Sequence, residues 1–395
     1  MRLSLCAIVK NEEASLMNCL MSVKDVVDEM VVLDTGSTDR TVAIAKAFGA
    51  TVGFYPWQDD FAAARNESLK FATGDWILVL DADEVLKPEI VPQIRQAMQN
   101  EHHLLVNLVR QEVGATQSPY SLVSRLFRCH PEIQFTHPYH AMVDDSVASL
   151  RDRENHWQVV SLSAVAIEHY GYQPGAIAGK NKLARAKTAM EAYLSEFPED
   201  TYTASKLGAI YVQLGEITQG IALLEQAIPK EGDPLVLFEL HYHLGIAQTR
   251  LENFNAAKMH YQAACELPIL RSLKLGAYLN WGNLLKAEGN LGGAILAYQQ
   301  ALAIDPQFAA AYYNLGMVCK QLGKIPEAIA AYQSAIQLNP HYAEAYQNLG
   351  VAFLKGGNVP ASLKAFSQAI ALYQKSNPQE AQRIRQELQT MGFKV

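Results

Sequence analysis

The sequence predicts two folds in series: an α/β domain with a mainly parallel sheet, then an all-α solenoid of helical hairpins. Two observations predict this division. From Leu3 to about Val109 short apolar runs alternate with amphipathic stretches, whereas from about Pro174 the strand-like runs disappear and the sequence repeats itself. The chain of 395 residues is long enough for two domains, or for one domain followed by a repeat array.

The α/β prediction rests on five short apolar runs, most of them rich in leucine and β-branched residues. Such runs are typical of strands that are buried on both faces of a sheet. Amphipathic stretches separate them, as expected for helices that connect parallel strands. Ligands of such sheets bind at the carboxyl ends of the strands, so functional side chains are expected there. The runs are Leu3–Val9, Met30–Leu33, Thr51–Phe54, Trp76–Leu80 and Leu104–Val109.

A period of 34 residues dominates the second part of the chain. The strings AYLNWG, AYYNLG and AYQNLG begin at Ala277, Ala311 and Ala345, each 34 residues after the one before. Glycine, alanine and an aromatic residue recur in the same phase, which suits paired helices that approach closely around one large side chain. This pattern resembles the tetratricopeptide repeat, whose unit is a helix–turn–helix. Two looser units precede it, at Leu207-Gly208 and Leu244-Gly245, so about five hairpins are expected.

These patterns predict four segments. We expect an α/β domain at 1–174, a linker helix at 175–200, about five repeats at 201–376 and a capping helix at 377–395. The cap is expected because the last repeat of a solenoid cannot bury its outer face alone.

Composition and charge exclude several classes of protein. The formal charge is −7 and no basic run occurs, which argues against a nucleic-acid partner. The five cysteines are scattered and none forms a CxxC pair, so neither a disulfide framework nor a cysteine zinc site is expected. The first apolar run is short and is followed by charge, as in a buried strand and unlike a signal peptide. We therefore expect a cytoplasmic protein without a transmembrane segment; peripheral membrane contact and a homo-oligomer both remain open.

The string GDWILVLDADE places two carboxylates at the end of a hydrophobic strand. Asp81 and Asp83 flank the small Ala82, so both side chains can turn toward one metal ion. Two carboxylates with open coordination positions suit Mg²⁺ or Mn²⁺ bound to a diphosphate. The alternative is that acidic residues simply end a strand, since short motifs need context.

Polar residues also follow two other predicted elements. The string VVLDTGSTDRT places Asp34 at a strand end, before a turn of small residues, and PWQDDFAAARNESL places Arg65 near the start of a helix. Three polar clusters at such positions within one α/β domain favour a binding site over three unrelated turns.

Together these strings resemble glycosyltransferase family 2, the inverting enzymes of the GT-A fold. The similar variant is the one shared by lipopolysaccharide-core glucosyltransferases and by bacteriocin S-glycosyltransferases. The opening LCAIVKNEEASL and the three strings above occur in the order and spacing of that family, over roughly Leu3–Tyr172. The resemblance implies a GT-A fold, a nucleotide-sugar donor that is usually a UDP sugar, and a Mn²⁺ or Mg²⁺ ion.

The resemblance also implies donor-binding residues. Asp34 matches the acid that reads the nucleotide base. Lys10, Asn11 and Glu12 follow the first strand, where the family frames the base and ribose. Arg65 matches an arginine near the base or the phosphates.

The metal site is implied in the same way. Asp83 matches the main metal ligand, and Asp81 matches the acid that contacts the ribose and lies beside the metal. His169, in the string IEHYGY, matches a histidine that can complete the site, although it can equally be a stabilising histidine under the linker helix. Arg125 and Arg128 are placed either to hold diphosphate oxygens or to form surface ion pairs.

The catalytic base should come from RLFRCHPEIQFTHPYHAMVDD, because an inverting transferase needs a group that takes the proton of the acceptor. Relatives carry a His-Glu pair where this chain has His140-Ala141, so the glutamate position is vacant. His140 is the first candidate because histidine titrates near neutrality. Asp144, with Asp145 beside it, is the second.

The repeats predict a protein or peptide partner. Asn280, Asn314 and Asn348 recur in phase on the first helix of three hairpins, and an asparagine amide can both donate to and accept from a peptide backbone. Such arrays bind extended peptides in a groove, and nucleocytoplasmic protein O-GlcNAc transferases resemble this arrangement. The alternative is that asparagine is simply common at this repeat position and that the array serves docking or dimerisation.

The hypothesis that these observations favour is a metal-dependent inverting hexosyltransferase that acts on a peptide, protein or cell-envelope acceptor. The alternative is a catalytically weak, transferase-like scaffold whose repeats mediate protein–protein interaction, which the vacant glutamate position supports. A nucleotidyltransferase is less favoured, because such enzymes usually carry a glycine-rich loop after the first strand, where this chain has KNEEAS.

Overall fold

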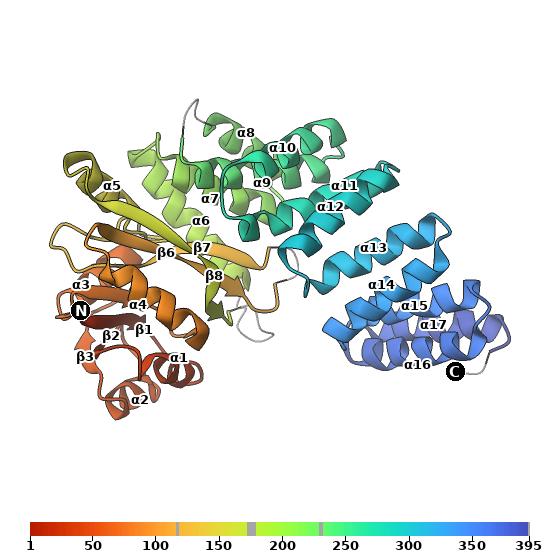
Figure 1. Cartoon of the computed structure of the whole chain (residues 1–395), viewed down its shortest axis with the longest axis horizontal. Coiled ribbons are helices and arrows are strands. Elements are labelled where there is room, and N and C mark those ends of the chain that lie inside the picture. Colours follow the sequence, from red (N-terminus) through yellow and green to blue (C-terminus); the bar gives the residue numbers. More distant parts are fainter. Residues whose placement is uncertain (116–117, 172–178, 229–231, 394–395) are drawn as a thin grey trace. The chain divides into compact units, whose positions relative to one another are not determined.

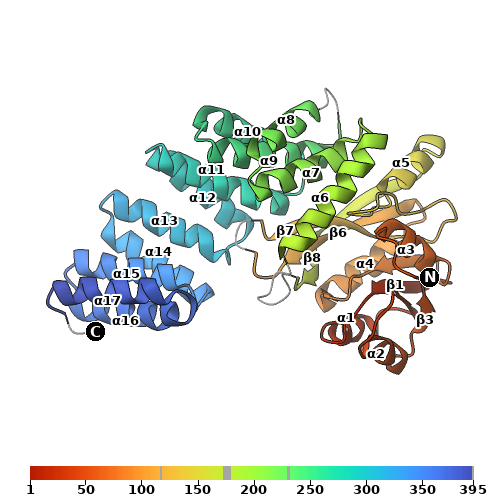
Figure 2. The same cartoon turned by 180° about the vertical axis from the view of Figure 1, so that it is seen from behind.

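The computed structural model describes residues 1–115, 118–171, 179–228 and 232–393. It divides into two compact units, Met1–Val236 and Leu237–Val395. The first unit holds an α/β domain and the helices that follow it, and the second is helical throughout its described residues (Figures 1 and 2). The predicted fold class, an α/β domain followed by a solenoid of hairpins, is confirmed.

One mixed sheet of eight strands organises the described part of the α/β domain, in the order β3-β2-β1-β4-β7-β6-β8-β5. β1 pairs in parallel with β2 and β4, and β2 pairs in parallel with β3. β7 runs antiparallel to β4 and β6, β5 runs antiparallel to β8, and β6 pairs in parallel with β8. The strands are β1 (Leu3–Val9), β2 (Glu29–Asp34), β3 (Thr51–Phe54), β4 (Trp76–Val79), β5 (Glu84–Leu86), β6 (His103–Glu112), β7 (Tyr120–Arg128) and β8 (Gln158–His169).

Helices cover both faces of this sheet because side chains alternate along each buried strand. On β1, Leu5 belongs to a core shared with the helices of one face, and its neighbour Cys6 belongs to the core of the opposite face. The first face carries α1 (Leu16–Val23), α2 (Thr41–Ala47) and α4 (Val91–Gln99, after a short 3₁₀ turn at Pro88–Ile90). The second face carries α3 (Phe61–Leu69) and α5 (Asp144–Arg153).

A β-bulge interrupts the pairing of β6 with β7. Val106 pairs with Leu126 and Leu108 pairs with Val123, so Ser124 and Arg125 together lie opposite the single residue between Val106 and Leu108. A bulge breaks the alternation of side chains and re-aims them locally. It therefore changes where two adjacent polar side chains of β7 can point, and both reach the candidate site.

Three helices follow the sheet within the first unit: α6 (Gly179–Glu196), α7 (Thr201–Leu214) and α8 (Ile217–Gln226). Met190 of α6 and Leu207 of α7 share a small core, and Tyr139 of the α/β domain packs against it. The predicted boundary between residues 174 and 175 lies outside the described residues, and the predicted segment limits stay predictions.

The remaining helices form the repeats of the second unit. Glycine in the first helix of a hairpin faces an aromatic ring of the second: a Cβ on Gly282, Gly316 or Gly350 would come within 2.5, 2.7 and 3.0 Å of Tyr298, Tyr332 and Phe366. Only a residue without a side chain allows this approach. The helices are α9 (Pro234–Arg250), α10 (Phe254–Glu266), α11 (Leu275–Ala287), α12 (Leu291–Ile304), α13 (Ala309–Gln321), α14 (Ile325–Leu338), α15 (Ala343–Lys355), α16 (Val359–Ser376) and α17 (Pro378–Thr390), with a 3₁₀ turn at Arg271–Lys274.

The last helix closes the array. α17 buries Ala381, Ile384 and Leu388 against α16, and its polar residues stay on the outside. This is the arrangement that a terminal repeat needs in order to bury its outer apolar face.

Candidate active site

The carboxyl ends of β1, β2 and β4 meet at one edge of the sheet. Val9 at the end of β1 pairs with Asp34 at the end of β2, and the Leu80 amide just after β4 donates to the carbonyl of Cys6. Parallel neighbours deliver their following loops to the same edge. The predicted residues of all three loops are therefore brought to one region.

The loops after β1 and β2 are tied to each other by side chains. Asn11 has a positive φ of +57°. Its side-chain Oδ1 accepts a hydrogen bond from the Thr38 backbone amide at 2.8 Å, and its backbone amide donates to Ser37 Oγ at 2.9 Å. Asp34 is buried and accepts from the amides of Gly36 and Ser37, both at 3.0 Å. Asn11 and Asp34 thus fix the shape of these loops through contacts within the protein.

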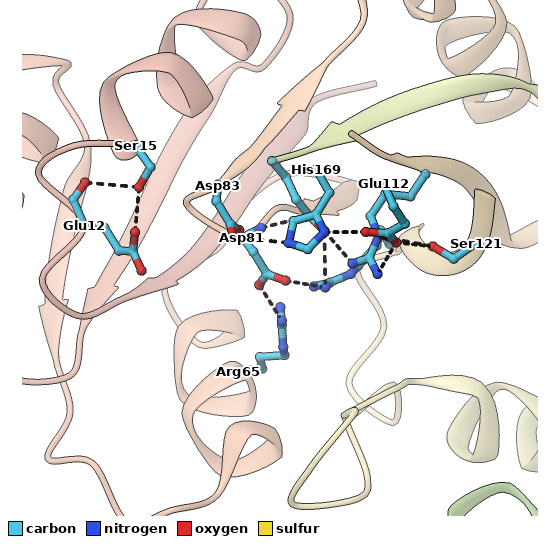
Figure 3. Close-up of polar contacts among 11 residues, drawn as sticks. Glu12, Ser15, Arg65, Asp81, Asp83, Glu112, Ser121 and His169 are labelled. Carbon is cyan, nitrogen blue, oxygen red and sulfur yellow. Dashed lines mark hydrogen bonds and ion pairs between the residues drawn. The ribbon is translucent and has the colours of Figure 1, made fainter. Parts of the chain in front are cut away.

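Glu12 brings a half-buried carboxylate to the same edge, and Lys10 before it is exposed. Ser15 Oγ donates to Glu12 Oε2 at 2.6 Å. Burial raises the pKa of Glu12, and the nearby carboxylates of Asp83 and Asp81 raise it further. Figure 3 shows Glu12 in contact with Ser15 and, at a distance from them, the pair of aspartates.

Asp81 is held between two arginines. Arg65 Nη2 donates to one carboxylate oxygen at 2.6 Å and Arg125 Nη2 donates to the other at 2.7 Å. Burial alone would raise the pKa of Asp81, but the Arg125 and Arg65 guanidinium groups hold it well below its usual range. Each carboxylate oxygen thus accepts one hydrogen bond and keeps a further lone pair, and metal ligation by Asp81 stays a prediction. The two guanidinium groups fix the orientation of its carboxylate.

Asp83 faces a different group. His169 Nε2 lies 3.2 Å from Asp83 Oδ2, and His169 Nδ1 lies 2.5 Å from Glu112 Oε2 (Figure 3). Burial lowers the pKa of His169, but the hydrogen bonds to Asp83 and Glu112 outweigh it and raise that pKa to about 9. A Cβ on Gly171 would meet His169 Nε2 at 2.6 Å and Asp83 Oδ2 at 3.1 Å, so glycine keeps the space beside this pair open.

These residues fit a divalent cation. When His169 donates its Nδ1–H to Glu112, its Nε2 turns toward Asp83, the arrangement that orients histidine ligands of metals. A carboxylate oxygen suits Mn²⁺ or Mg²⁺, and an imidazole nitrogen is a common ligand of divalent metal ions. No group of three or more His, Cys, Asp or Glu residues that could hold a metal occurs in the described residues. Asp83 and His169 would thus need further ligands from a bound diphosphate or from water.

A buried network of charged side chains on β5 and β6 holds the turn that carries Asp81. Arg110 on β6 donates to Glu84 at 2.8 Å and also pairs with Glu112 at 2.8 Å. Glu84 is completely buried and accepts from the Asp81 amide at 2.8 Å, which fixes the turn after β4. Sequence reasoning missed Glu84, Arg110 and Glu112. The signal that was available is the acidic residue directly after the DAD string.

The two arginines of the RLFR string, Arg125 and Arg128, make different contacts. Arg125 reaches Asp81 because the bulge aims it there. Arg128 donates to the carbonyls of His103 and Asn100, both at 2.7 Å, and lies over the Trp76 ring. The expectation that Arg128 holds diphosphate oxygens is wrong. Its guanidinium group is hydrogen-bonded at the start of β6, whereas Glu112 and the candidate site lie at the other end of that strand.

The second residue of the bulge leads to Asp144. Ser124 Oγ lies 2.9 Å from Asp144 Oδ1 and 3.1 Å from Asn107 Oδ1. The other carboxylate oxygen of Asp144 is buried and has no hydrogen-bond partner. Burial raises the pKa of Asp144 to about 6. Adjacent residues of β7 therefore contact Asp81 and Asp144, which connects the two carboxylates through the bulge.

His140 lies on a loop that is closed by a bridge between Thr136 and Met142. Its side chain is exposed, its φ is +56° and its ring packs edge-on against Tyr139. Ala141 follows it and offers no group for proton transfer. The structure thus separates the two candidate bases, one on the exposed loop and one buried at the start of α5.

His137 anchors this loop and was missed by sequence reasoning. It is buried, with φ of +65°; its Nε2 lies 2.9 Å from Asp145 Oδ2 and its Nδ1 lies 3.3 Å from Thr203 Oγ1 of α7. Burial lowers the pKa of His137, but the carboxylates of Asp145 and Asp200 outweigh it and raise that pKa. The first helical hairpin therefore helps to position the segment that carries both candidate bases.

The predicted asparagine ladder has internal contacts. Asn280 Nδ2 donates to Tyr242 OH at 3.3 Å, and the Nδ2 atoms of Asn314 and Asn348 donate to carbonyls of their own helices at 3.0 Å. The role of these three residues in peptide binding stays a prediction.

Comparisons with known proteins match both parts of the chain. Residues 4–160 match the glycosyl transferase family 2 model, and residues 282–321 and 316–357 match a TPR repeat model. A TPR repeat-containing protein of Synechococcus elongatus is 44% identical over 307 residues, which are 77% of this chain and 76% of that protein. The SPbeta prophage-derived glycosyltransferase SunS of Bacillus subtilis is 30% identical over 197 residues, 49% of this chain and 45% of SunS.

Solved structures of other proteins each match about half of the chain or less. MamA is 24% identical with a TM-score of 0.38, over 43% of this chain and 96% of MamA. YrrB, described as a TPR protein with an unusual peptide-binding site, is 17% identical with a TM-score of 0.40, over 51% of this chain and 99% of YrrB. Within the described residues, no helix is long and apolar enough to cross a membrane.

Proposed function

The chain belongs to glycosyltransferase family 2 and carries tetratricopeptide repeats behind its transferase domain, and from that premise we propose a metal-dependent inverting hexosyltransferase. It moves a hexose from a nucleotide sugar, with UDP as the nucleotide, to a peptide, protein or cell-envelope acceptor. The observation that carries the proposal is the pair of Asp83 and His169, oriented by Glu112 and placed beside the arginine-held Asp81.

The donor nucleotide binds over the loops after β1 and β2. Asp34 and Asn11 hold these loops in one shape, so that Lys10 and Glu12 can frame the base and ribose. Asp81 presents a carboxylate of fixed orientation to the ribose, and Arg65 acts through Asp81 as a positioning residue. Preorganised polar groups cost little reorganisation when the ligand binds, which favours a tightly held donor.

Asp83 and His169 would hold the divalent ion, and Glu112 fixes the tautomer and ring orientation of His169. When bound, such an ion supplies positive charge against the negative charge that develops on the departing diphosphate. Asp81, whose carboxylate oxygens both accept hydrogen bonds from arginines, contacts the ribose of the donor. It is not required as a ligand of the metal ion.

Asp144 is the better-supported base. Its carboxylate, with a pKa of about 6, is a stronger base than an ordinary aspartate and is still mostly ionised at neutral pH. Its unpartnered oxygen can accept the hydrogen bond of an acceptor hydroxyl or thiol. As the acceptor atom bonds to the anomeric carbon, its proton passes to Asp144 and the electron pair of the broken bond leaves on the diphosphate. His140 is the second candidate, and its exposed ring suits contact with the acceptor.

The scaffold alternative is favoured by one observation, the alanine at position 141 where relatives carry glutamate. In that case the repeats are the functional part of the chain and the α/β domain binds no nucleotide-sugar donor. Donor binding separates the two functions.

The experiment is calorimetric titration of UDP, GDP and UDP-glucose into the purified protein, first with Mn²⁺ and then with EDTA. The proposal predicts binding of one nucleotide that EDTA abolishes, with Asp83→Ala losing the metal-dependent part. Asp152→Ala, an exposed aspartate of α5, is the matched control and should bind as the wild type does. A folded protein that binds none of these nucleotides would instead favour the scaffold.

A further inference from the structure

Two histidines face each other across the hairpin of α9 and α10. His241 lies on α9 and His260 on α10, and their Nδ1 atoms are 3.0 Å apart. The ring centroids are 5.3 Å apart and the ring planes are tilted by 34°. Both side chains are half-buried, so they are partly open to solvent. We call His241 and His260 the histidine pair.

The histidine pair departs from the pattern of the other hairpins. His241 lies four residues before the glycine of its hairpin, Gly245, and His260 directly precedes the aromatic residue, Tyr261. In the three hairpins that follow, these positions hold a tyrosine and an alanine: Tyr278 and Ala297, Tyr312 and Ala331, and Tyr346 and Ala365. Tyrosine and alanine therefore satisfy the packing of the repeat. The histidine pair supplies two ring nitrogens that packing does not require.

The two helices are packed closely beside the pair. A Cβ on Gly245 would come within 2.5 Å of the Tyr261 ring, and Gly245 lies one turn from His241 while Tyr261 is the neighbour of His260. Thr249 Oγ1 of α9 also lies 3.3 Å from Tyr261 OH. These contacts limit how far the two imidazole rings can separate. The pair is thus preorganised, which reduces the cost of binding a ligand between the rings.

Both imidazoles are held in the neutral form that binds metals. Burial lowers the pKa of His241 and of His260, and repulsion from His260 lowers that of His241 further. In the hydrogen-bonded pair, one Nδ1 carries a proton and the other accepts it. Transfer of this proton through water to the Nε2 of the same ring leaves two Nδ1 lone pairs that face each other. The net charge of the pair does not change in this step.

We propose that the histidine pair binds one divalent transition-metal ion through its two Nδ1 atoms. Bonds of about 2.0–2.1 Å place two imidazole nitrogens of one ion about 2.9 Å apart at a right angle and about 3.4 Å apart at a tetrahedral angle. The observed separation of 3.0 Å lies between these values, so the ion can enter with small rotations of the rings. This site lies outside the proposed donor site and does not depend on the transferase proposal.

The ligands favour particular ions. Two imidazoles suit Cu²⁺, Ni²⁺ and Zn²⁺ better than Mn²⁺ or Mg²⁺. The described residues hold no group of three or more His, Cys, Asp or Glu that could bind a metal, so water completes the coordination of the ion. Its affinity is therefore lower than that of structural zinc sites, which use four protein ligands. The bound ion joins α9 to α10 and stabilises the folded hairpin, because the unfolded chain does not hold the two rings together.

The test is calorimetric titration of Ni²⁺ into the full chain, prepared without a polyhistidine tag and freed of metal with EDTA. The double variant His241→Gln/His260→Gln should weaken one site by about tenfold or more, since even partners that only orient metal ligands contribute that much. Each single variant should lose about as much as the double variant, because one ion needs both rings. Thermal unfolding should show a Tm that Ni²⁺ raises in the wild type and that EDTA restores.

Two control variants locate the site. His102→Gln/His156→Gln replaces two exposed histidines whose ring centroids are 6.1 Å apart, and it should keep the Ni²⁺ site. Asp83→Ala removes a ligand of the proposed donor site and should keep the Ni²⁺ site as well. Electron paramagnetic resonance of the wild type with one equivalent of Cu²⁺ needs no variant, so the inference stays testable even if the double variant unfolds. Its spectrum should show coupling to the nitrogens of two imidazoles.

Three results would overturn the inference: unchanged Ni²⁺ binding in the folded His241→Gln/His260→Gln variant, an equal loss in His102→Gln/His156→Gln, or a Cu²⁺ spectrum without imidazole nitrogens. Titration of UDP with Mn²⁺ separates this inference from the transferase proposal. The histidine-pair variant should bind UDP like the wild type. A chain that binds Ni²⁺ at the pair and no nucleotide would contradict the transferase proposal alone.

Discussion

The donor side and the acceptor side of the candidate site are built differently. On the donor side, the loops after β1, β2 and β4 are short and follow directly from strands, and paired groups hold Asp34 and Asp81 in place. On the acceptor side, Asp144 depends on a bulge in β7, and the loop of His137 depends on a contact with α7. The residues of the proposed donor side are thus held mainly by contacts within short strings, whereas those of the proposed acceptor side are positioned by distant segments.

This difference indicates which substitutions would affect donor binding and which would affect use of the acceptor. A loop that follows a strand keeps its position as long as the sheet is intact. A segment positioned by α7 also depends on the helical hairpin, so the repeats and the acceptor loop are physically connected within the first unit. We therefore expect variants of the proposed donor side to affect nucleotide binding, and variants of the proposed acceptor side to affect turnover without weakening nucleotide binding.

The largest expected effect is that of Asp144→Asn. Loss of a general base typically lowers kcat by about 10²- to 10⁴-fold, because the acceptor must then lose its proton to water. UDP release from the donor in the presence of acceptor measures kcat, and calorimetry should show unchanged UDP binding.

The pH dependence of turnover is a second test of Asp144 as the catalytic base. In the wild type, turnover should fall as the pH drops below about 6, since protonated Asp144 cannot accept a proton. Asp144→Asn should lack that limb. If His140→Ala removes the limb and Asp144→Asn keeps it, the assignment of the base is reversed.

The next effect concerns stability on the donor side. Glu84→Ala removes a fully buried carboxylate from Arg110 and from the turn at Asp81, and should lower the free energy of unfolding by about 3–5 kcal/mol. Urea denaturation measures this loss. Glu132→Ala, which breaks an exposed pair with Arg153, is the control and should change little. Equal losses in the two variants would show that the buried network adds no stability of its own.

The smallest expected effect concerns pH and the acceptor loop. The pKa of His137 is raised in the folded chain, so its contribution to stability is fully present below its unfolded value of about 6.5. That contribution is lost as the pH rises through the folded pKa. His137→Gln should therefore destabilise the chain more at pH 6 than at pH 9, as thermal unfolding can measure. A loss that is independent of pH would mean that His137 acts through packing against Tyr193 and Tyr202 alone.

The sequence predicted the donor side because its residues lie in short strings that follow hydrophobic strands. Asp34 and Asp81 were placed correctly at the edge of the sheet by strand patterns alone. The contact of Asp81 with Arg125 could not be predicted from the sequence, since Arg125 lies on a strand and is 44 residues away in the chain.

On the proposed acceptor side the sequence named His140 and Asp144 as candidate bases, but it did not predict the contacts that position them, because those contacts come from distant segments. A β-bulge has no marked sequence signature, yet it decides that Ser124 reaches Asp144. His137 looked like one histidine among several, and its role depends on Thr203, 66 residues further along the chain. In the repeats the asparagines were visible through their period, whereas the contact of His241 with His260 was not recognised.

The measurement that tests the account most directly is anomalous scattering from crystals grown with UDP and Mn²⁺. We predict a manganese peak between Asp83 Oδ2 and His169 Nε2, with Asp81 still bound by Arg65 and Arg125. A peak on Asp81 with its arginines displaced, or nucleotide bound without any manganese near Asp83, would contradict it.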